Sequence, residues 1–192
     1  VLIVVIPFFA AYVFFAGRRE GEKRFAAVAA FCAALVPGVA LVLWYNAARF
    51  GSILDFGYST GPDVWFGFST PMLSGLYGLL FSPGKSVFLY APPVIAGIAG
   101  AAAFHRKNRS ESFLFWGIIV AIITVYSKWW AWHGDWAWGP RFLVPFVPLA
   151  VIPAVGLLEW RGAARAVAAA GVCVILLFSF RVQLLGVTVN YS

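Results

Sequence analysis

The chain has 192 residues, of which 62% are hydrophobic and only 11% are charged, and its mean hydropathy is +0.89. A soluble domain carries about 25% charged residues, so one water-facing core cannot hide this much apolar surface, and the composition indicates a polytopic membrane protein. The net charge of +7 comes mostly from three short basic loops, which excludes nucleic-acid binding because no exposed basic domain remains to carry it.

Six apolar runs predict an all-α fold of about six transmembrane helices in a single transmembrane domain, residues 1–192. The runs are Val1–Ala16, Phe25–Tyr45, Gly84–Phe104, Ser112–Ser127, Phe142–Leu158 and Ala166–Leu185. Pro7 predicts a kink in the first, and Pro92 and Pro93 break the third. Because the first run is short and no Met or charged leader precedes it, we expect an internal piece of a longer protein.

Basic residues cluster in three loops that fall on alternate connections between these helices. The members are Arg18, Arg19, Lys23, Arg24, Arg106, Lys107, Arg109, Arg161 and Arg165. Loops rich in Lys and Arg face the cytoplasm. We therefore expect loops 46–83 and 128–141 to face outward.

The first outward loop contains a further helical segment over residues 71–81. Thr70 is suited to be its N-cap, with Pro71 at the first helical position. The segment is too short to span a bilayer, so it predicts a helix in the membrane interface. A buried re-entrant turn is the alternative.

The rule that Lys and Arg gather in cytoplasmic loops does not explain the cations at the outer ends of the helices. Lys85 begins the third predicted helix, Lys128 ends the fourth and Arg141 begins the fifth. Converging cations at one depth suit a phosphate or pyrophosphate head group, with Arg offering a planar fork and Lys a point charge. The alternative is that each side chain reaches separately to the membrane surface.

The stretch Lys128–Arg141, KWWAWHGDWAWGPR, concentrates aromatic and polar side chains between two apolar runs. Indole rings anchor proteins at membrane interfaces, yet they also stack on sugar rings while the N–H binds hydroxyls. His133 and Asp135 lie two residues apart, on one face if the segment is extended. They suit a hydroxylated ligand or structural hydrogen bonds. With no third ligand in the sequence, we expect no metal.

Three segments carry a family resemblance. NAARFGSILDFGY (46–58), GLLFSPGKSVFLYAPP (78–93) and WWAWHGDWAWGPRFLVPFVP (129–148) resemble the later half of bacterial GT-C type membrane glycosyltransferases. The nearest likeness is to phospholipid-carrier-dependent, protein-mannosyltransferase-like members. HGD stands where a glycine-rich stretch is more usual, which leaves the acceptor open.

The resemblance implies an enzyme of the bacterial plasma membrane that transfers a sugar from a polyprenyl-phosphate donor to an outer-face acceptor, with no further cofactor. It implies that the catalytic carboxylate lies in a loop upstream of this chain. Lys85 and Arg141 become candidate lipid-phosphate contacts. The candidate sugar or acceptor contacts are His133, Asp135, Trp129, Trp130, Trp132, Trp136 and Tyr58.

Two other functions fit a polytopic chain. A transporter or flippase of a lipid-linked solute requires ionisable groups at mid-membrane depth, and the charged residues here sit at the ends of the predicted helices. A non-catalytic membrane scaffold requires no site joining Lys85, Arg141 and the tryptophan-rich stretch. The bilayer and a polyprenyl-phosphate-linked sugar are the expected partners, and the sequence predicts no oligomeric state.

Overall fold

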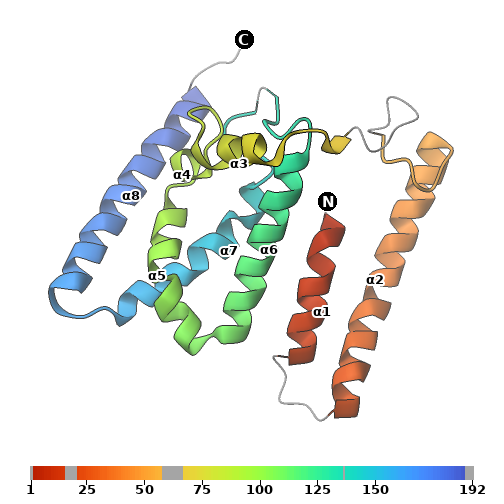
Figure 1. Cartoon of the computed structure of the whole chain (residues 1–192), viewed down its shortest axis with the longest axis horizontal. Helices are drawn as coiled ribbons and strands as arrows, with labels where there is room; N and C mark the ends of the chain where they lie inside the picture. The colour runs from red at the N-terminus through yellow and green to blue at the C-terminus, as the bar shows by residue number, and fades with distance from the viewer. Residues whose placement is uncertain (1, 16–20, 58–66, 136, 189–192) are drawn as a thin grey trace.

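The computed structural model describes residues 2–15, 21–57, 67–135 and 137–188, and within these ranges the chain is helical with no strands. The elements are η1 Leu2–Val5, α1 Ile6–Phe15, α2 Gly21–Phe50, α3 Met72–Phe81, α4 Val87–Tyr90, α5 Pro93–Lys107, α6 Arg109–Lys128, η3 Val144–Phe146, α7 Val147–Val151, η4 Ile152–Glu159 and α8 Gly162–Thr188. The all-α prediction is therefore confirmed (Figure 1).

Three of the helices are long and apolar enough to cross a membrane: α2, α6 and α8. A helix of 20 residues, the length of α6, is about 30 Å long, the thickness of a hydrocarbon core. The apolar windows of α2 and α8 have no buried residue, whereas a third of the α6 window is buried. Apolar side chains exposed around two long helices indicate a lipid-facing protein, with α6 nearer its centre.

The helix α2 extends further than the predicted run Phe25–Tyr45. It continues to Phe50, so the predicted outer loop 46–83 begins with helix rather than with loop. Asn46 is buried near this end, and its Nδ2 donates a hydrogen bond to the carbonyl oxygen of Ile53, 3.2 Å away. This bond folds the chain back after Phe50 and gives the polar side chain a partner.

The third predicted helix, Gly84–Phe104, is broken in two. Lys85 does not begin it: residues 82–86 form a turn, and Ser86 caps α4 by accepting from the N–H of Phe88. Between α4 and α5, Ala91 leaves the helical conformation ahead of Pro92 and Pro93. Proline lacks an N–H and disfavours helix in the preceding residue, so the predicted break is confirmed and the predicted start is wrong.

The fifth predicted helix, Phe142–Leu158, is not one α-helix either. It consists of η3, α7 and η4, and only the middle element is α-helical. The prolines at 145, 148 and 153 each fall at the first or second position of one of these elements. At the first turn of a helix the backbone N–H has no partner within the helix, so a proline is tolerated there. Each new element therefore begins where the backbone hydrogen bonds of the previous helix cannot continue.

The helix α5 packs directly against this irregular segment, backbone to backbone (Figure 1). A Cβ added at Gly97 would lie 1.8 Å from the carbonyl oxygen of Ala150, and one at Gly100 would lie 2.3 Å from that of Pro153. A Cβ added at Gly156 would in turn lie 2.2 Å from the carbonyl oxygen of Gly100. Without the hydrophobic effect inside a bilayer, such close approach of small residues is what holds helices together.

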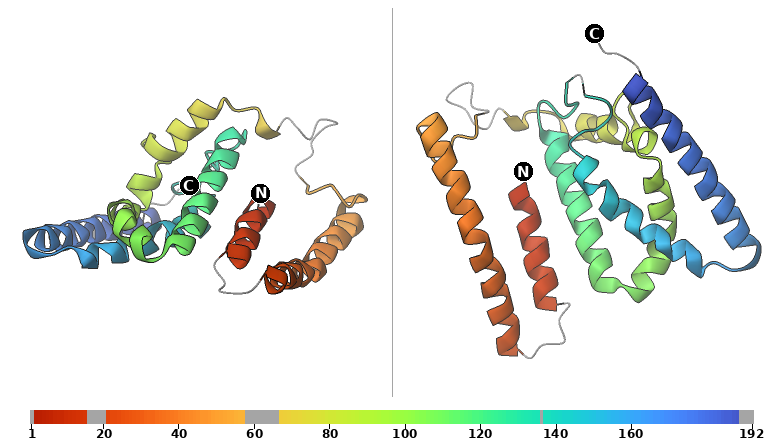
Figure 2. Two further views of the ribbon diagram at one scale, coloured as in Figure 1. Left: turned by 60° about the horizontal axis from the view of Figure 1, so that its bottom comes forward. Right: turned by 180° about the vertical axis from the view of Figure 1, so that it is seen from behind.

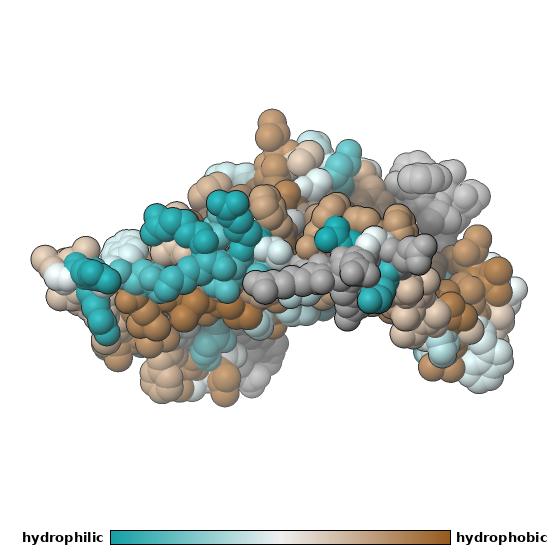
Figure 3. Space-filling view, turned by 90° about the horizontal axis from the view of Figure 1, so that it is seen from below, coloured by the Kyte–Doolittle hydropathy of each residue, from teal (hydrophilic) through white to brown (hydrophobic). Residues whose placement is uncertain are grey.

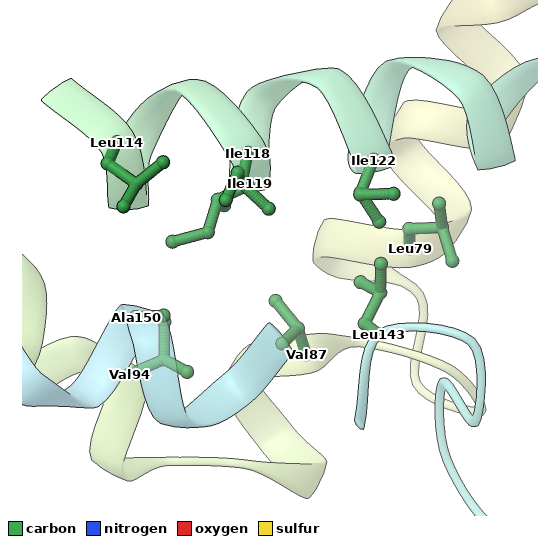
Figure 4. Packing of buried hydrophobic residues seen from close by; sticks show 9 residues of the cluster. All are labelled: Leu79, Val87, Val94, Leu114, Ile118, Ile119, Ile122, Leu143 and Ala150. Carbon is green, nitrogen blue, oxygen red and sulfur yellow. The ribbon is translucent and has the colours of Figure 1, made fainter. Parts of the chain in front are cut away.

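The predicted helix over residues 71–81 is confirmed as α3, which lies across the end of α6 (Figure 1). Figure 4 shows Ile122 of α6, Leu79 of α3 and Leu143 pointing toward one another in the core. A Cβ at Gly75 would lie 1.9 Å from the carbonyl oxygen of Ser127, so α3 rests on the α6 backbone. Thr70 is not the N-cap: Pro71 holds that position without a side-chain cap.

At the other side of the molecule, α1 packs against both α2 and α6 (Figure 2). The 3-10 turn η1 gives way to α1 at Ile6, immediately before Pro7. The helix α1 is therefore the link through which α2 joins the bundle around α6.

Candidate functional site

The tryptophan segment, residues 128–141, is anchored at its start to the residues that precede α3. The N–H of Trp130 donates to the carbonyl oxygen of Gly67 at 2.8 Å, and the N–H of Thr70 donates to that of Lys128 at 3.2 Å. The Thr70 hydroxyl adds a bond to the carbonyl oxygen of Trp129 at 3.0 Å. The hydroxyl predicted to cap α3 thus ties two loops together instead.

Lys85 reaches the same segment from the turn before α4. Its Nζ donates to the carbonyl oxygens of Asp135, at 2.9 Å, and Ala137, at 2.5 Å. The turn is held by Ser82, whose Oγ donates to the carbonyl oxygen of Gly78 and accepts from the N–H of Lys85. A hydrogen bond from a charged donor is stronger than one between neutral groups, so Lys85 clamps the loop at Asp135 and Ala137.

His133 and Asp135 lie close together, although the segment between them is not extended. Gly134 and Asp135 have φ values of 69° and 52°, which fold the chain into a tight turn. The N–H of Asp135 donates to His133 Nδ1 at 3.1 Å, and that nitrogen lies 3.8 Å from Asp135 Oδ1. Because Nδ1 accepts, the neutral imidazole carries its proton on Nε2 and can present it as a donor.

Arg141 closes the segment with an exposed side chain. Its guanidinium carbon lies 4.9 Å from the centroid of the Phe142 ring. A Cβ at Gly134 would lie 3.1 to 3.3 Å from Cγ, Nε and Cδ of Arg141, so glycine leaves room for that chain to lie along the turn. No carboxylate of the described residues lies within ion-pair distance of Arg141.

The two predicted phosphate-binding cations are close enough to affect each other. Burial is the main cause that lowers the pKa of Lys85, and the positive charge of Arg141 lowers it further. The carboxylate of Asp135 opposes both by raising it. Two cations that repel each other across a loop are stabilised when an anion arrives.

The tryptophans mostly serve packing. Trp129 lies edge-to-face with Phe68, centroids 5.3 Å apart, and Trp132 covers Gly78, where a Cβ would lie 2.1 Å from its ring. By contrast, Trp130 is 56% exposed. Of the predicted sugar contacts in the described ranges, the structure therefore leaves Trp130, His133 and Asp135 accessible. Trp136 and Tyr58 lie outside the described residues.

Sequence reasoning missed the role of Gln183. Its Nε2 donates to the carbonyl oxygen of Tyr90 at 2.8 Å, joining α8 to the α4–α5 break. Trp138 packs edge-to-face on Tyr90, with centroids 5.2 Å apart, and also contacts α8 at Gly186. The sequence did carry a signal for this contact: Gln183 is a lone side-chain amide in the apolar run of α8, and polar groups in such runs usually have partners.

A half-open groove of about 80 Å³ is lined in part by residues that closely follow the two cations in the chain. Val87 and Phe88 line it shortly after Lys85, and Leu143 and Phe146 line it shortly after Arg141. Every side chain along it is apolar, including Ile119 on α6. An aliphatic chain is the kind of ligand that gains from such a surface.

A metal site requires a group of ligating side chains. Within the described ranges, no three His, Cys, Asp or Glu side chains are grouped to hold a metal ion.

Comparison with known proteins adds no relative. Neither family models, nor curated proteins, nor solved structures match this chain.

Proposed function

We propose that this chain binds a polyprenyl-phosphate-linked sugar at the tryptophan segment and takes part in transfer of that sugar to an outer-face acceptor. The observation that carries the proposal is the exposed guanidinium of Arg141, beside Lys85, together with a wholly apolar groove whose lining includes residues that closely follow both cations in the chain. A lipid carrier has the same two parts, a phosphate and a long apolar chain. Arg is the side chain best suited to bind a phosphate in two places.

The membrane arrangement behind this proposal has six crossings. The helices α2, α6 and α8 supply three, and η1–α1, α4–α5 and η3–α7–η4 supply the others. The last of these is short, but 3-10 turns rise about 2.0 Å per residue, so its 16 residues extend roughly 30 Å. With the basic loops in the cytoplasm of a bacterial cell, loops 46–83 and 128–141 face outward and α3 lies in the interface.

Within the reaction, this chain acts on the phosphate. The bond between the sugar's anomeric carbon and the phosphate oxygen breaks as the acceptor oxygen bonds to that carbon, and the acceptor proton passes to a base. We assign no residue of this chain as that base. Arg141 stabilises the charge that develops on the departing phosphate, while Lys85 holds the loop that carries His133 and Asp135.

The sugar contacts follow from accessibility. Trp130 offers an exposed indole face for stacking, and the His133 Nε2–H with the Asp135 carboxylate offers a donor and an acceptor for hydroxyls. Trp129 and Trp132 support these groups from behind rather than touching the ligand.

The proposal is tested by binding of a polyprenyl phosphate to the intact protein in nanodiscs, compared with the corresponding polyprenol. Loss of one charged hydrogen-bond partner costs about 1.5–3 kcal/mol, so Arg141→Gln should weaken phosphate binding about tenfold or more. Polyprenol binding should not change. Arg161→Gln, an exposed arginine before α8, is the matched control. Equal binding of phosphate and polyprenol by the wild-type protein would contradict the proposal.

Transfer is tested in cells. Arg141→Ala should reduce sugar transfer strongly and leave the lipid-linked donor to accumulate, while expression stays intact. Unchanged transfer with intact expression would remove Arg141 from the reaction. Phosphate binding without any transfer by the wild-type protein would favour a carrier of the lipid over an enzyme.

A further inference from the structure

A second cleft lies between α1 and the first turns of α6, and the proposed transfer reaction does not use it. Its volume is about 350 Å³, within the range of small-molecule sites, and it is half-open. Phe8, Phe15 and Phe113 supply aromatic rings to its lining, and only Tyr12 and Ser110 supply polar groups to it. The cleft therefore suits a ligand that is apolar over most of its surface.

The cleft has an apolar end and a polar end, because α1 and α6 run in opposite directions (Figure 1). At the apolar end, a Cβ added at Gly117 of α6 would lie 2.6 Å from the ring of Phe8. At the polar end, the Tyr12 hydroxyl on α1 donates to Glu111 Oε1 on α6 at 3.1 Å. Residues 111 and 117 are about 9 Å apart along the helix axis. A ligand between the helices thus meets aromatic rings along its length and a carboxylate at one end.

The carboxylate of Glu111 is the charge held at the polar end. Glu111 is half-buried, and no lysine or arginine of the described residues lies within ion-pair distance of it. Arg109, two residues earlier, starts about 200° around α6 and so lies on another side of the helix. The Tyr12 hydroxyl is the one donor to this carboxylate in the described part of the chain, whereas a carboxylate can accept about four hydrogen bonds. Negative charge and accepting capacity therefore remain for a ligand.

The depth of the carboxylate also matters. Glu111 lies in the first turn of α6, and in a bilayer that α6 crosses, this turn lies near the lipid head groups. Figure 3 looks onto this end of the molecule and shows hydrophilic side chains in a band beside apolar surface. The carboxylate is thus placed at the level of a lipid head group, and the aromatic rings are placed at the level of its acyl chains.

We propose that the cleft between α1 and α6 binds one phospholipid with a primary-ammonium head group, of the phosphatidylethanolamine type. The ammonium donates to the Glu111 carboxylate, and an acyl chain lies against the aromatic rings. Hydrogen bonds between charged groups are stronger than those between neutral groups. A choline head group has no N–H to donate, and a phosphatidylglycerol carries a net negative charge that Glu111 repels. The ammonium lipid is the one of the three that matches both ends of the cleft.

The test uses the wild-type protein in phosphatidylcholine nanodiscs that contain a trace of phosphatidylethanolamine with a diazirine on one acyl chain. Peptide mapping should place the label on residues 8–15 or 110–114. The same diazirine on phosphatidylcholine or phosphatidylglycerol should label these residues at least about fivefold less, the effect of one hydrogen bond of ordinary strength. Equal labelling by the three lipids, or stronger labelling by phosphatidylglycerol, would overturn the proposal.

A charge-removing variant identifies the head-group contact. Glu111→Gln keeps an acceptor for the Tyr12 hydroxyl but removes the charge, so labelling by phosphatidylethanolamine should fall to the level of phosphatidylcholine. Glu159→Gln removes an exposed carboxylate, bound to Lys107, at the same end of the molecule. This matched control should label as wild type does. An unchanged preference for phosphatidylethanolamine in Glu111→Gln would contradict the assigned contact.

Filling the cleft tests where the acyl chain lies. Ala11→Trp places a large ring in the cleft and should abolish the label at 110–114 with every lipid. Ala34→Trp, on the exposed helix α2, is the control and should not change it. Label retained at 110–114 in a folded Ala11→Trp protein would place the chain outside the cleft and overturn the proposal. If Ala11→Trp does not fold, the mapping in wild type and the Glu111→Gln comparison still decide the matter.

Discussion

The side-chain nitrogen of Lys85 lies 2.9 Å from the backbone carbonyl oxygen of Asp135, fifty residues further along the chain. This contact joins the turn before α4 to the middle of the tryptophan segment. A second bond from the same nitrogen goes to the carbonyl oxygen of Ala137. The lysine predicted to bind phosphate thus has a prior role, which is to hold the loop that presents His133 and Asp135.

Removing this clamp should loosen the loop without unfolding the helices. Lys85→Met keeps the aliphatic stem and deletes both donors, so amide hydrogen exchange of residues 133–138 should accelerate about tenfold or more, as expected when a charged hydrogen bond is lost. Exchange in α6 should not change. Lys128→Met, which removes an exposed lysine at the same end of α6, is the control. Equal protection of the loop in both variants would show that the clamp has no effect.

The titration of Lys85 should report on its neighbours. Burial and Arg141 lower the pKa of Lys85 and Asp135 raises it, so Arg141→Gln should move the pKa up and Asp135→Asn should move it down. Carbon-13 shifts of labelled lysine side chains, assigned with Lys85→Met, would follow both. A shift of the opposite sign in either variant would contradict the arrangement of the three groups.

The same pKa carries a small stability effect. Folding lowers the pKa of Lys85. At pH values between the folded pKa and the ordinary lysine value near 10.4, the Lys85 ammonium therefore keeps its proton more often in the unfolded chain than in the folded one. Stability should therefore rise slightly as pH increases through that window. The Lys85→Met variant should lack this rise, measured by thermal unfolding in detergent at several alkaline pH values.

Glycine at position 97 should be intolerant of any side chain. A Cβ there would lie 1.8 Å from the carbonyl oxygen of Ala150, a backbone atom that cannot rotate away. Gly97→Ala should destabilise the protein by about 1–3 kcal/mol through overpacking, visible as a lower melting temperature by circular dichroism. Gly171→Ala on α8 meets nothing within 4 Å and should be neutral or slightly stabilising. Equal melting temperatures would mean that α5 and α7 can separate freely.

Replacing Trp130 and replacing Trp132 should affect stability and ligand binding differently. Trp132 packs on Gly78 of α3, so Trp132→Ala leaves a cavity and should lower stability by about 3 kcal/mol. Trp130 is 56% exposed, so Trp130→Ala should leave the melting temperature nearly unchanged while weakening sugar-dependent binding. Melting curves and binding of the lipid-linked sugar, measured on both variants, separate the two roles. A large stability loss in Trp130→Ala would assign it to packing as well.

Much of the helical layout could be read from the sequence because it is encoded locally. An apolar run predicts helix, and the consecutive Pro92 and Pro93 predict a break in one, as the division between α4 and α5 confirms. The short helix α3 was predicted for the same reason. The prolines after Phe142 indicated interruption as well, but not that most of this segment would take up 3-10 geometry.

The site depended on contacts between distant residues. Lys85 and Asp135, Thr70 and Trp129, and Gln183 and Tyr90 form hydrogen bonds across 50, 59 and 93 positions, and no local pattern indicates such partners. The sequence by itself determined an all-helical, lipid-facing chain with cations and aromatics gathered at helix ends. Only the tertiary structure decided that Lys85 clamps a loop, that Arg141 stays exposed, and which tryptophans pack against neighbouring segments. The reason is that hydrophobicity and proline geometry act within one segment, whereas a side chain's role depends on which other segment the fold places against it.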